Sequence, residues 1–455
     1  MTQEEKVVYM TTEPVNKLVC KMAVPTIISM LITSFYNMAD TYFVGKLNTQ
    51  STAAVGVVFS LMALIQALGF FFGHGSGNYI SRKLGAKEFE DASKMASIGF
   101  FSAFICGIFV LTFGLIFLEP LSVLLGSTDT ILPFTKKYLS VILLGAPFMV
   151  SSLVLNNQLR FQGSASSAMV GIVSGAVLNI ILDPIFIFHF NMGITGAALA
   201  TVIGQLVGFV LLFIGTRRGD NIHIKWKNFK PSLFYYKEVV RGGIPSLCRQ
   251  GLASVSTMCL NHMAGDFGDA AIAGMSIVSR ITMFANSALI GFGQGFQPVC
   301  GMNYGAKLYK RVKDAFWFCV KYAFIFLIAV AAAAYIFAPE MVILFRKDDR
   351  KVVEIGMLAL RFQAVVFPLN AWIVLCNMML QSIGKAVKAS IIAAARQGLF
   401  FLPLILILPR IFGLPGIQIC QMVSDILTFM LAVPLGISVL KEMKEENKKN
   451  EELEY

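Results

Sequence analysis

The sequence predicts an all-α membrane protein with twelve transmembrane helices, arranged as two six-helix lobes related by a pseudo-two-fold axis along the membrane normal. Three observations support this fold class: an apolar composition, twelve long apolar runs and an internal repeat. Of the 455 residues, 56% are hydrophobic and only 14% are charged, whereas soluble proteins are about 45–50% apolar. This composition indicates an integral membrane protein.

The apolar runs predict the individual spans. A helix needs about 20 apolar residues to cross the roughly 30 Å hydrocarbon core of a bilayer. The first run is not expected to be a cleaved signal peptide, because residues 1–14 contain three glutamates and one lysine and no A-x-A site follows. The predicted spans lie near residues 17–44, 52–77, 93–117, 137–158, 166–188, 194–216, 238–261, 270–298, 315–338, 355–380, 387–409 and 414–440.

Basic residues predict the orientation of the chain. With an even number of spans, most lysines and arginines fall in loops on the same side as the N-terminus, which predicts that both termini are cytoplasmic in the plasma membrane of a prokaryote. The net charge of +12 is then explained by loops that face anionic lipid at the inner leaflet. Nucleic acid is therefore not an expected partner.

The second half of the chain repeats the landmarks of the first half at a shift of about 220 residues. Pro25 corresponds to Pro245, and the sequence GAK occurs at 85–87 and again at 305–307. An even number of spans in each unit gives both halves the same topology. The predicted segments are a cytoplasmic N-terminal segment (1–16), an N-terminal lobe (17–216), a polar and basic cytoplasmic linker (217–237), a C-terminal lobe (238–440) and a cytoplasmic tail (441–455).

The architecture of two helical lobes in the membrane, without a soluble domain, favours a secondary transporter. In such transporters the lobes expose a central cavity alternately to each side of the membrane. The sequence contains no Walker motif for ATP drive and no repeated selectivity filter for a channel. It also contains no recognisable nucleophile and base pair, so an enzyme is not expected, and no cofactor is expected. The eight cysteines are scattered without C-x-x-C spacing, which predicts packing residues rather than a metal site or a disulfide framework.

Two carboxylates inside the spans are the strongest functional candidates. Asp183 is followed by Pro184 within the fifth span, and Asp40 lies near the end of the first. An aspartate at the centre of a membrane helix costs about 2.5–3.5 kcal/mol on insertion scales, whereas polar contacts between membrane helices contribute only about 0.6 kcal/mol on average. Asn179 and Tyr36 each precede one acid by four residues and share its helical face. Such an oxygen-rich group suits H⁺ or Na⁺, and the sequence leaves both open.

The repeat is asymmetric at these positions. Pro184 corresponds to Pro403, but the position equivalent to Asp183 lies near Leu402 and is uncharged. Prolines free a backbone carbonyl and allow a membrane helix to bend. We therefore expect both lobes to bend, with Pro25 and Pro184 as bends in the first, and only the first lobe to carry the coupling ion.

Four stretches resemble the multidrug and toxic compound extrusion (MATE) transporters, in particular the DinF-like and MepA-like prokaryotic branch. They are NMADTYFVGKL, GNYISRKLGAK, NIILDPIFIF and GITGAALAT. The resemblance implies a cation site in the N-terminal lobe and a first helix whose bend, with Pro25 as pivot, displaces the drug. It implies no metal other than Na⁺ at Asp40 and Asp183. By motif position, the implied coupling residues are Asp40, Asn179, Asp183 and Thr201, with Tyr36 and Asn156 nearby.

The predicted function is export of small amphipathic, mostly cationic compounds by antiport with H⁺ or Na⁺, by a monomer in the bilayer. The 39 phenylalanines and 22 methionines include residues that can form adaptable surfaces for such compounds. The alternative is a flippase for a lipid-linked glycan, which a cavity lined by Arg249, Arg280 and Arg396 would favour. The candidate cavity residues are Gln294, Gln297, Asn261 and Arg280.

Overall fold

The computed structural model describes residues 2–345 and 349–453, and these residues form helices and connecting turns without a strand. The first half consists of α1 (Gln3–Thr12), α2 (Val15–Gly45), α3 (Thr49–Gly85), α4 (Phe89–Ile116), α5 (Leu118–Leu124), α6 (Leu132–Phe161), α7 (Ala165–Pro184), the π-helical turn η1 (Ile185–His189) and α8 (Gly193–Thr216). A short 3₁₀ turn, η2 (Trp226–Asn228), lies in the connection to the second half.

The second half repeats this order. It consists of α9 (Leu233–Gly265), α10 (Asp269–Gly305), α11 (Tyr309–Ile336), α12 (Ala338–Ile343), α13 (Arg350–Val366), α14 (Leu369–Ser382), α15 (Ala386–Ala394), the π-helical turn η3 (Ala395–Leu399), α16 (Phe401–Phe412) and α17 (Leu414–Leu453). Helix α9 therefore begins inside the predicted linker, and α17 continues through the predicted tail.

The predicted fold class is confirmed. Among the described residues, ten helices are long and apolar enough to cross a membrane, or eleven if α13 and α14, which meet at an angle of 59°, are counted as one span. The predicted span at residues 238–261 corresponds to α9, which has 33 residues but is less apolar, since it carries Arg241, Arg249 and several hydroxyl groups. Its polar content has a structural reason, because α9 packs between the lobes and lines the cavity described below.

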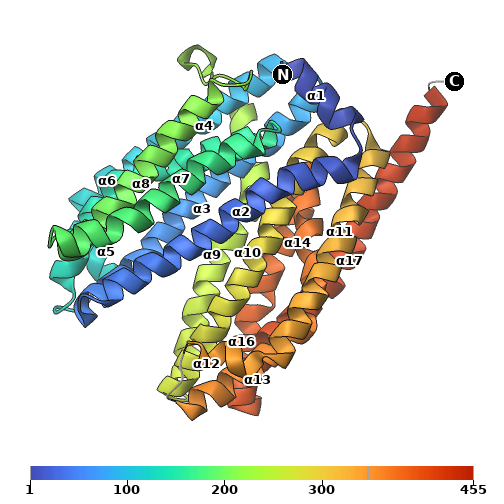
Figure 1. Ribbon diagram of the computed structural model, residues 1–455. Helices are drawn as coiled ribbons and strands as arrows, with labels where there is room; N and C mark the ends of the chain where they lie inside the picture. The colour runs from blue at the N-terminus through green and yellow to red at the C-terminus, as the bar shows by residue number, and fades with distance from the viewer. Residues whose placement is uncertain (1, 346–348, 454–455) are drawn as a thin grey trace.

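The two lobes converge at one end of the molecule and diverge toward the other (Figure 1). Both termini lie at the end where the lobes converge, which we call the terminal end. The first lobe contains α2–α8 and the second contains α9–α17. The opposite end carries the short helices α5 and α12.

Proline has different effects at equivalent positions. Pro147 lies inside α6, which remains one helix, whereas its counterpart Pro368 lies at the bend between α13 and α14. The α-helical pattern also changes to a π turn directly after Pro184, and again shortly before Pro403.

By contrast, α2 is helical throughout despite Pro25. Near Pro25, α2 packs closely against α10, where Gly291 and Gly295 leave room for its backbone.

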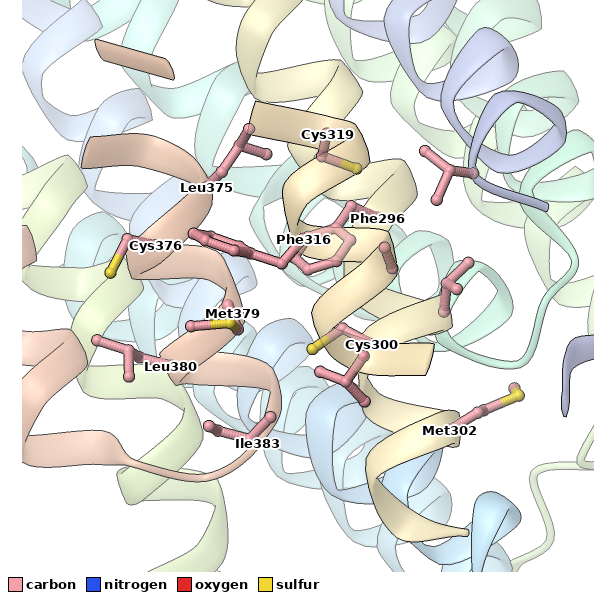
Figure 2. Close-up of a cluster of buried hydrophobic side chains, with 14 of the residues drawn as sticks. Phe296, Cys300, Met302, Phe316, Cys319, Leu375, Cys376, Met379, Leu380 and Ile383 are labelled. Carbon is pink, nitrogen blue, oxygen red and sulfur yellow. The ribbon is translucent and has the colours of Figure 1, made fainter. Parts of the chain in front are cut away.

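The largest buried apolar cluster includes side chains from α10, α11 and α14 of the second lobe (Figure 2). Phe296 and Phe316 lie 6.5 Å apart between ring centroids, and Cys300, Cys319 and Cys376 are fully buried among them. Because lipid tails are as apolar as these side chains, close packing rather than expulsion of water holds such a core together. Four of the eight cysteines are buried, as their positions within the spans suggest.

Candidate functional site

A cavity of about 610 Å³ lies between the lobes. It is lined by α2, α3 and α6–α8 from the first lobe and by α9, α10 and α13–α17 from the second. The polar lining of the first lobe includes Tyr36, Asn37, Gln66, Ser152, Asn156, Asn179, Thr201 and Gln205, together with hydroxyl groups of α2. The polar lining of the second lobe includes Arg249, Gln250, Asn286, Arg280, Gln294, Arg396 and Asp425.

Two of the four predicted cavity residues line the cavity. Gln294 and Arg280 do so, but Gln297 and Asn261 lie outside the lining. Gln297 follows Gln294 by three residues and points toward α14 instead, where its Nε2 donates to Gln381 Oε1 at 3.3 Å. Asn261 lies on an exposed face of α9.

Asp183, Asn179 and Thr201 form one hydrogen-bonded group. Asp183 is fully buried on α7, one residue before the end of the helix. The Asn179 amide satisfies both its ends when its nitrogen donates to Asp183 Oδ2 at 3.3 Å and its oxygen accepts from the Thr201 backbone N–H at 3.0 Å. Asn179 and Asp183 are four residues apart and therefore lie on one face of α7. Thr201 faces them from the neighbouring helix α8, so the three predicted residues lie together.

Asp40 and Tyr36 lie on α2 beside this group. Asp40, Asp183 and the phenol of Tyr36 are electrostatic neighbours. Neither carboxylate forms an ion pair with a lysine or arginine in residues 2–345 and 349–453. Asp183 is fully buried and Asp40 is partly buried, so ionising both carboxyl groups without a neighbouring cation is costly.

Three oxygen atoms in this cluster are buried without a hydrogen-bond partner among the described residues: Asp40 Oδ1, Asp183 Oδ1 and the Tyr138 hydroxyl. Tyr138 belongs to the same group, because Asp40, Asp183 and Thr201 are among its polar neighbours. The sequence analysis did not identify Tyr138, although a tyrosine within the apolar run of the fourth span was a signal. We call Asp40, Asp183, Asn179, Thr201, Tyr36 and Tyr138 the acidic cluster.

Asn156 does not belong to the acidic cluster. Its Nδ2 donates to the Ala168 carbonyl at 3.0 Å, and Ala168 precedes Asp183 by fifteen residues on α7, or about 22 Å along the helix. The second lobe contains the same bond, from Asn377 to the Ala389 carbonyl at 2.6 Å. This bond occurs in both halves of the chain, whereas Asp40 and Asp183 occur only in the first. The bond therefore does not depend on the acidic cluster, and its role is to connect α6 to α7.

The second lobe contains a buried carboxylate of a different kind. Asp425 accepts from Arg396 at 2.8 and 3.2 Å and from Gln421 at 2.7 Å. Its charge is therefore compensated within the protein. This agrees with the expectation that the second lobe has no carboxylate free to exchange an ion.

A polar network closes the cavity toward the terminal end. Arg160 on α6 donates to Gln294 of the other lobe and to Asn157 at 2.6 Å, and its Nη2 lies 3.2 Å from His74 Nε2. Since arginine only donates, His74 Nε2 accepts and its Nδ1–H faces Ser246 Oγ at 3.0 Å. We call Arg160, Asn157, His74, Ser246, Gln294, Gln297 and Gln381 the inter-lobe network.

Helices α3 and α10 cross beneath this network through two equivalent glycines. A Cβ atom at Gly85 would overlap the Met302 carbonyl oxygen, and one at Gly305 would overlap the Arg82 carbonyl oxygen. Arg82 also joins the lobes, since it donates to Glu238 at 3.1 Å and to the Ser382 carbonyl at 3.0 Å. The absence of side chains at both glycines allows the lobes to meet at the terminal end.

The comparison with known families gives the same division into halves. The MatE family model matches residues 25–185 and, a second time, residues 245–407. The chain belongs to the MatE family. The two matches begin at Pro25 and Pro245, which confirms both the resemblance to the MATE transporters and the internal repeat.

Relatives within the MatE family cover nearly the whole chain. Over 435 residues the chain is 28% identical to "Multidrug export protein MepA" of Staphylococcus aureus, with 95% of each chain covered. A solved structure described as the outward-facing conformation of a multidrug resistance MATE family transporter is similar with a TM-score of 0.90 and 28% identity, covering 96% of this chain and 98% of that one. A MATE structure in the bent conformation has a TM-score of 0.89 at 28% identity, covering the same shares.

Proposed function

We propose that the protein is a secondary multidrug exporter, which moves small amphipathic, mostly cationic compounds out of the cell in exchange for H⁺ or Na⁺. The observation that supports this most directly is a pair of carboxylates without a cationic partner, Asp40 and Asp183, each with one buried oxygen, beside a cavity between two lobes. The relatives described as multidrug exporters support the substrate class.

The terminal end is proposed to face the cytoplasm of a prokaryotic cell. The connecting loops at that end carry most of the basic residues, which favours the cytoplasmic side. The lobes meet at this end through Gly85, Gly305 and Arg82 and diverge toward the other end, which supports a cavity that opens away from the cytoplasm. The conformation is then the outward-facing state of an alternating-access cycle.

Ion exchange follows from the chemistry of the acidic cluster. In the outward-facing state, H⁺ or Na⁺ reaches Asp40 and Asp183 and removes their mutual repulsion. The cluster connects α2, α7 and α8, and Tyr36, Asn179 and Thr201 also line the cavity. A change in the charge of the acids therefore acts on the cavity wall, and it is proposed to displace the bound drug.

Transport in reconstituted vesicles tests the proposal. We expect ethidium to move through the purified protein when a pH gradient or a Na⁺ gradient is imposed, and the effective gradient identifies the coupling ion. Vesicles without protein supply the background rate. If ethidium moves under neither gradient, the exporter proposal is wrong.

Pro25→Ala is expected to lower the transport rate several-fold more than the affinity for ethidium. Pro25 lacks the N–H that would bond within α2, so this helix can bend, and alanine restores the bond and stiffens it. Initial rates in vesicles and equilibrium fluorescence titration measure the two effects separately. Pro434→Ala, in the lipid-exposed part of α17, is the matched control, and an equal loss of rate and affinity would contradict a role in bending.

The lipid-linked glycan flippase is the second candidate. Arg249, Arg280 and Arg396 all line the cavity, as that function would require. Arg396, however, is compensated by Asp425, and the relatives named above are multidrug transporters. The exporter is therefore the preferred function.

A further inference from the structure

The linker between the lobes, residues 217–232, lies against α4 of the first lobe. Its Ile224 packs against the apolar cluster that contains Phe100, and the Lys225 backbone N–H donates to Ser97 Oγ at 3.4 Å. Ser97 lies eight residues after the start of α4, or about 12 Å along the helix. The linker therefore covers the first turns of this membrane-spanning helix.

Trp226 and Phe229 of the linker continue an apolar stripe on α4. Their ring centroids lie 4.8 and 5.4 Å from that of Phe101. Beyond Phe101, exposed apolar residues recur along α4 every three or four positions and therefore occupy one face of the helix. They are Ile105, Phe109, Phe113 and Ile116. An exposed apolar face of a membrane-spanning helix contacts lipid, so Trp226 lies at one end of a lipid-facing surface.

Trp226 has the position of an aromatic residue at the edge of a bilayer. It is 67% exposed, although its ring packs on Phe101. Tyr236, in the first turn of α9, reaches the same part of α4, since its hydroxyl lies 3.0 Å from Ser102 Oγ. Tryptophan and tyrosine are enriched where the hydrocarbon core of a membrane meets the lipid headgroups. We therefore expect α4 to enter the hydrocarbon core near Phe101.

Three lysines of the linker flank this tryptophan in the sequence: Lys225, Lys227 and Lys230. All three are exposed, and none forms an ion pair with another described residue. The carboxylate of Glu90 is an electrostatic neighbour of Lys230, but it already pairs with Lys94 at 2.8 Å. Lysines beside an apolar surface extend their ammonium groups toward the polar phase. The three ammonium groups are therefore free to bind the phosphates of lipid headgroups.

We propose that the linker is a binding site for anionic phospholipid at the membrane surface. Lys225, Lys227 and Lys230 donate to the headgroup phosphates, while the Trp226 ring lies between the headgroups and the acyl chains. A membrane fits this segment better than a nucleic acid does, because the lysines lie at the end of a lipid-facing apolar surface. A basic loop without an aromatic anchor has only a diffuse attraction to an anionic leaflet. Lipid bound here holds the connection between the lobes on the first lobe.

Quenching of Trp226 fluorescence by brominated lipid tests this inference. The full-length protein is placed in two sets of nanodiscs that contain the same minor fraction of phosphatidylglycerol in phosphatidylcholine. In one set the phosphatidylglycerol is brominated, and in the other an equal amount of phosphatidylcholine is brominated. The emission of Trp226 is the difference between the protein and its Trp226→Phe variant, which removes one of three tryptophans at an exposed position.

We expect brominated phosphatidylglycerol to quench Trp226 about threefold more strongly than brominated phosphatidylcholine, because lysines near the membrane surface attract anionic lipid. The combined variant Lys225→Gln, Lys227→Gln and Lys230→Gln should lose this preference and still be quenched by brominated phosphatidylcholine. The combined variant Lys444→Gln, Lys448→Gln and Lys449→Gln is the matched control, because it removes three exposed positive charges from the C-terminal part of α17. It should keep the preference.

Equal quenching by the two brominated lipids in the unmodified protein would overturn the inference, as would a preference that survives the loss of the linker lysines. Absence of quenching by either lipid would also overturn it, because Trp226 would then lie away from the bilayer. The proposed function is judged separately by gradient-driven transport. A lipid preference without transport leaves this inference standing and refutes the exporter, and transport without a lipid preference does the reverse.

Discussion

Asp183→Asn is expected to abolish gradient-driven export while the protein remains folded and still binds dye. Asparagine has nearly the same shape and can still accept from Asn179 within α7, so the Asn179 amide keeps its orientation and its bond to Thr201 on α8. It cannot take up and release a proton, and it lacks the charge that would hold Na⁺. The variant should therefore retain the cavity and lose the coupling.

The measurement is ethidium movement in vesicles under the gradient that drives the wild type, together with an equilibrium binding titration. We expect the rate to fall to the level of vesicles without protein and the affinity to remain within about threefold of the wild type. Asp129→Asn, at an exposed loop position, is the matched control and should behave like the wild type. Gradient-driven movement at a nearly normal rate in the Asp183 variant would exclude Asp183 from coupling.

Gly305→Leu is expected to stop transport by preventing the lobes from closing at the terminal end. A Cβ atom there overlaps the backbone oxygen of Arg82, and a backbone atom cannot rotate away as a side chain can. Overpacking of this kind typically costs about 1–3 kcal/mol. This is enough to shift an equilibrium between two lobe arrangements by about tenfold or more.

Hydrogen–deuterium exchange measures this shift directly. Backbone amides at the ends of α3 and α10 should exchange faster in the Gly305 variant, because their close contact is lost. Gly56→Leu is the control, since Gly56 also lies on α3 but a Cβ atom there would meet nothing within 4 Å. Unchanged exchange at both helix ends, with a normal transport rate, would show that the glycine contact is not needed for closure.

The fold could be predicted because the bilayer imposes simple requirements on the sequence. Span length, apolar content and the repeat of Pro25 at Pro245 are local or periodic properties, and they led to the two lobes. Part of the acidic cluster followed in the same way, since Asn179 and Asp183 are one helical turn apart. The position of Thr201 came from the resemblance to the MATE transporters.

The remainder of the site depends on how distant segments meet, and the sequence has no local signal for that. Arg160 and Gln294 are 134 residues apart, and nothing near either residue indicates the other. Gln294 and Gln297 are three residues apart on one helix, yet only Gln294 faces the cavity. Asn156 was named from the resemblance to the MATE transporters as a neighbour of the ion site, whereas in the structure its bond to Ala168 connects two helices.

The composition of the inter-lobe network determines how readily the molecule can leave this conformation. Its members are amides, a hydroxyl, an imidazole and a guanidinium, and each can exchange its protein partner for water as the lobes separate. If the lobes met through an apolar contact of the same extent, their separation would expose apolar surface to water, and no hydrogen bond to water would offset the lost contact. In the proposed alternating-access cycle, the two states can therefore be close in free energy, so that a modest difference in ligand affinity between them shifts their populations.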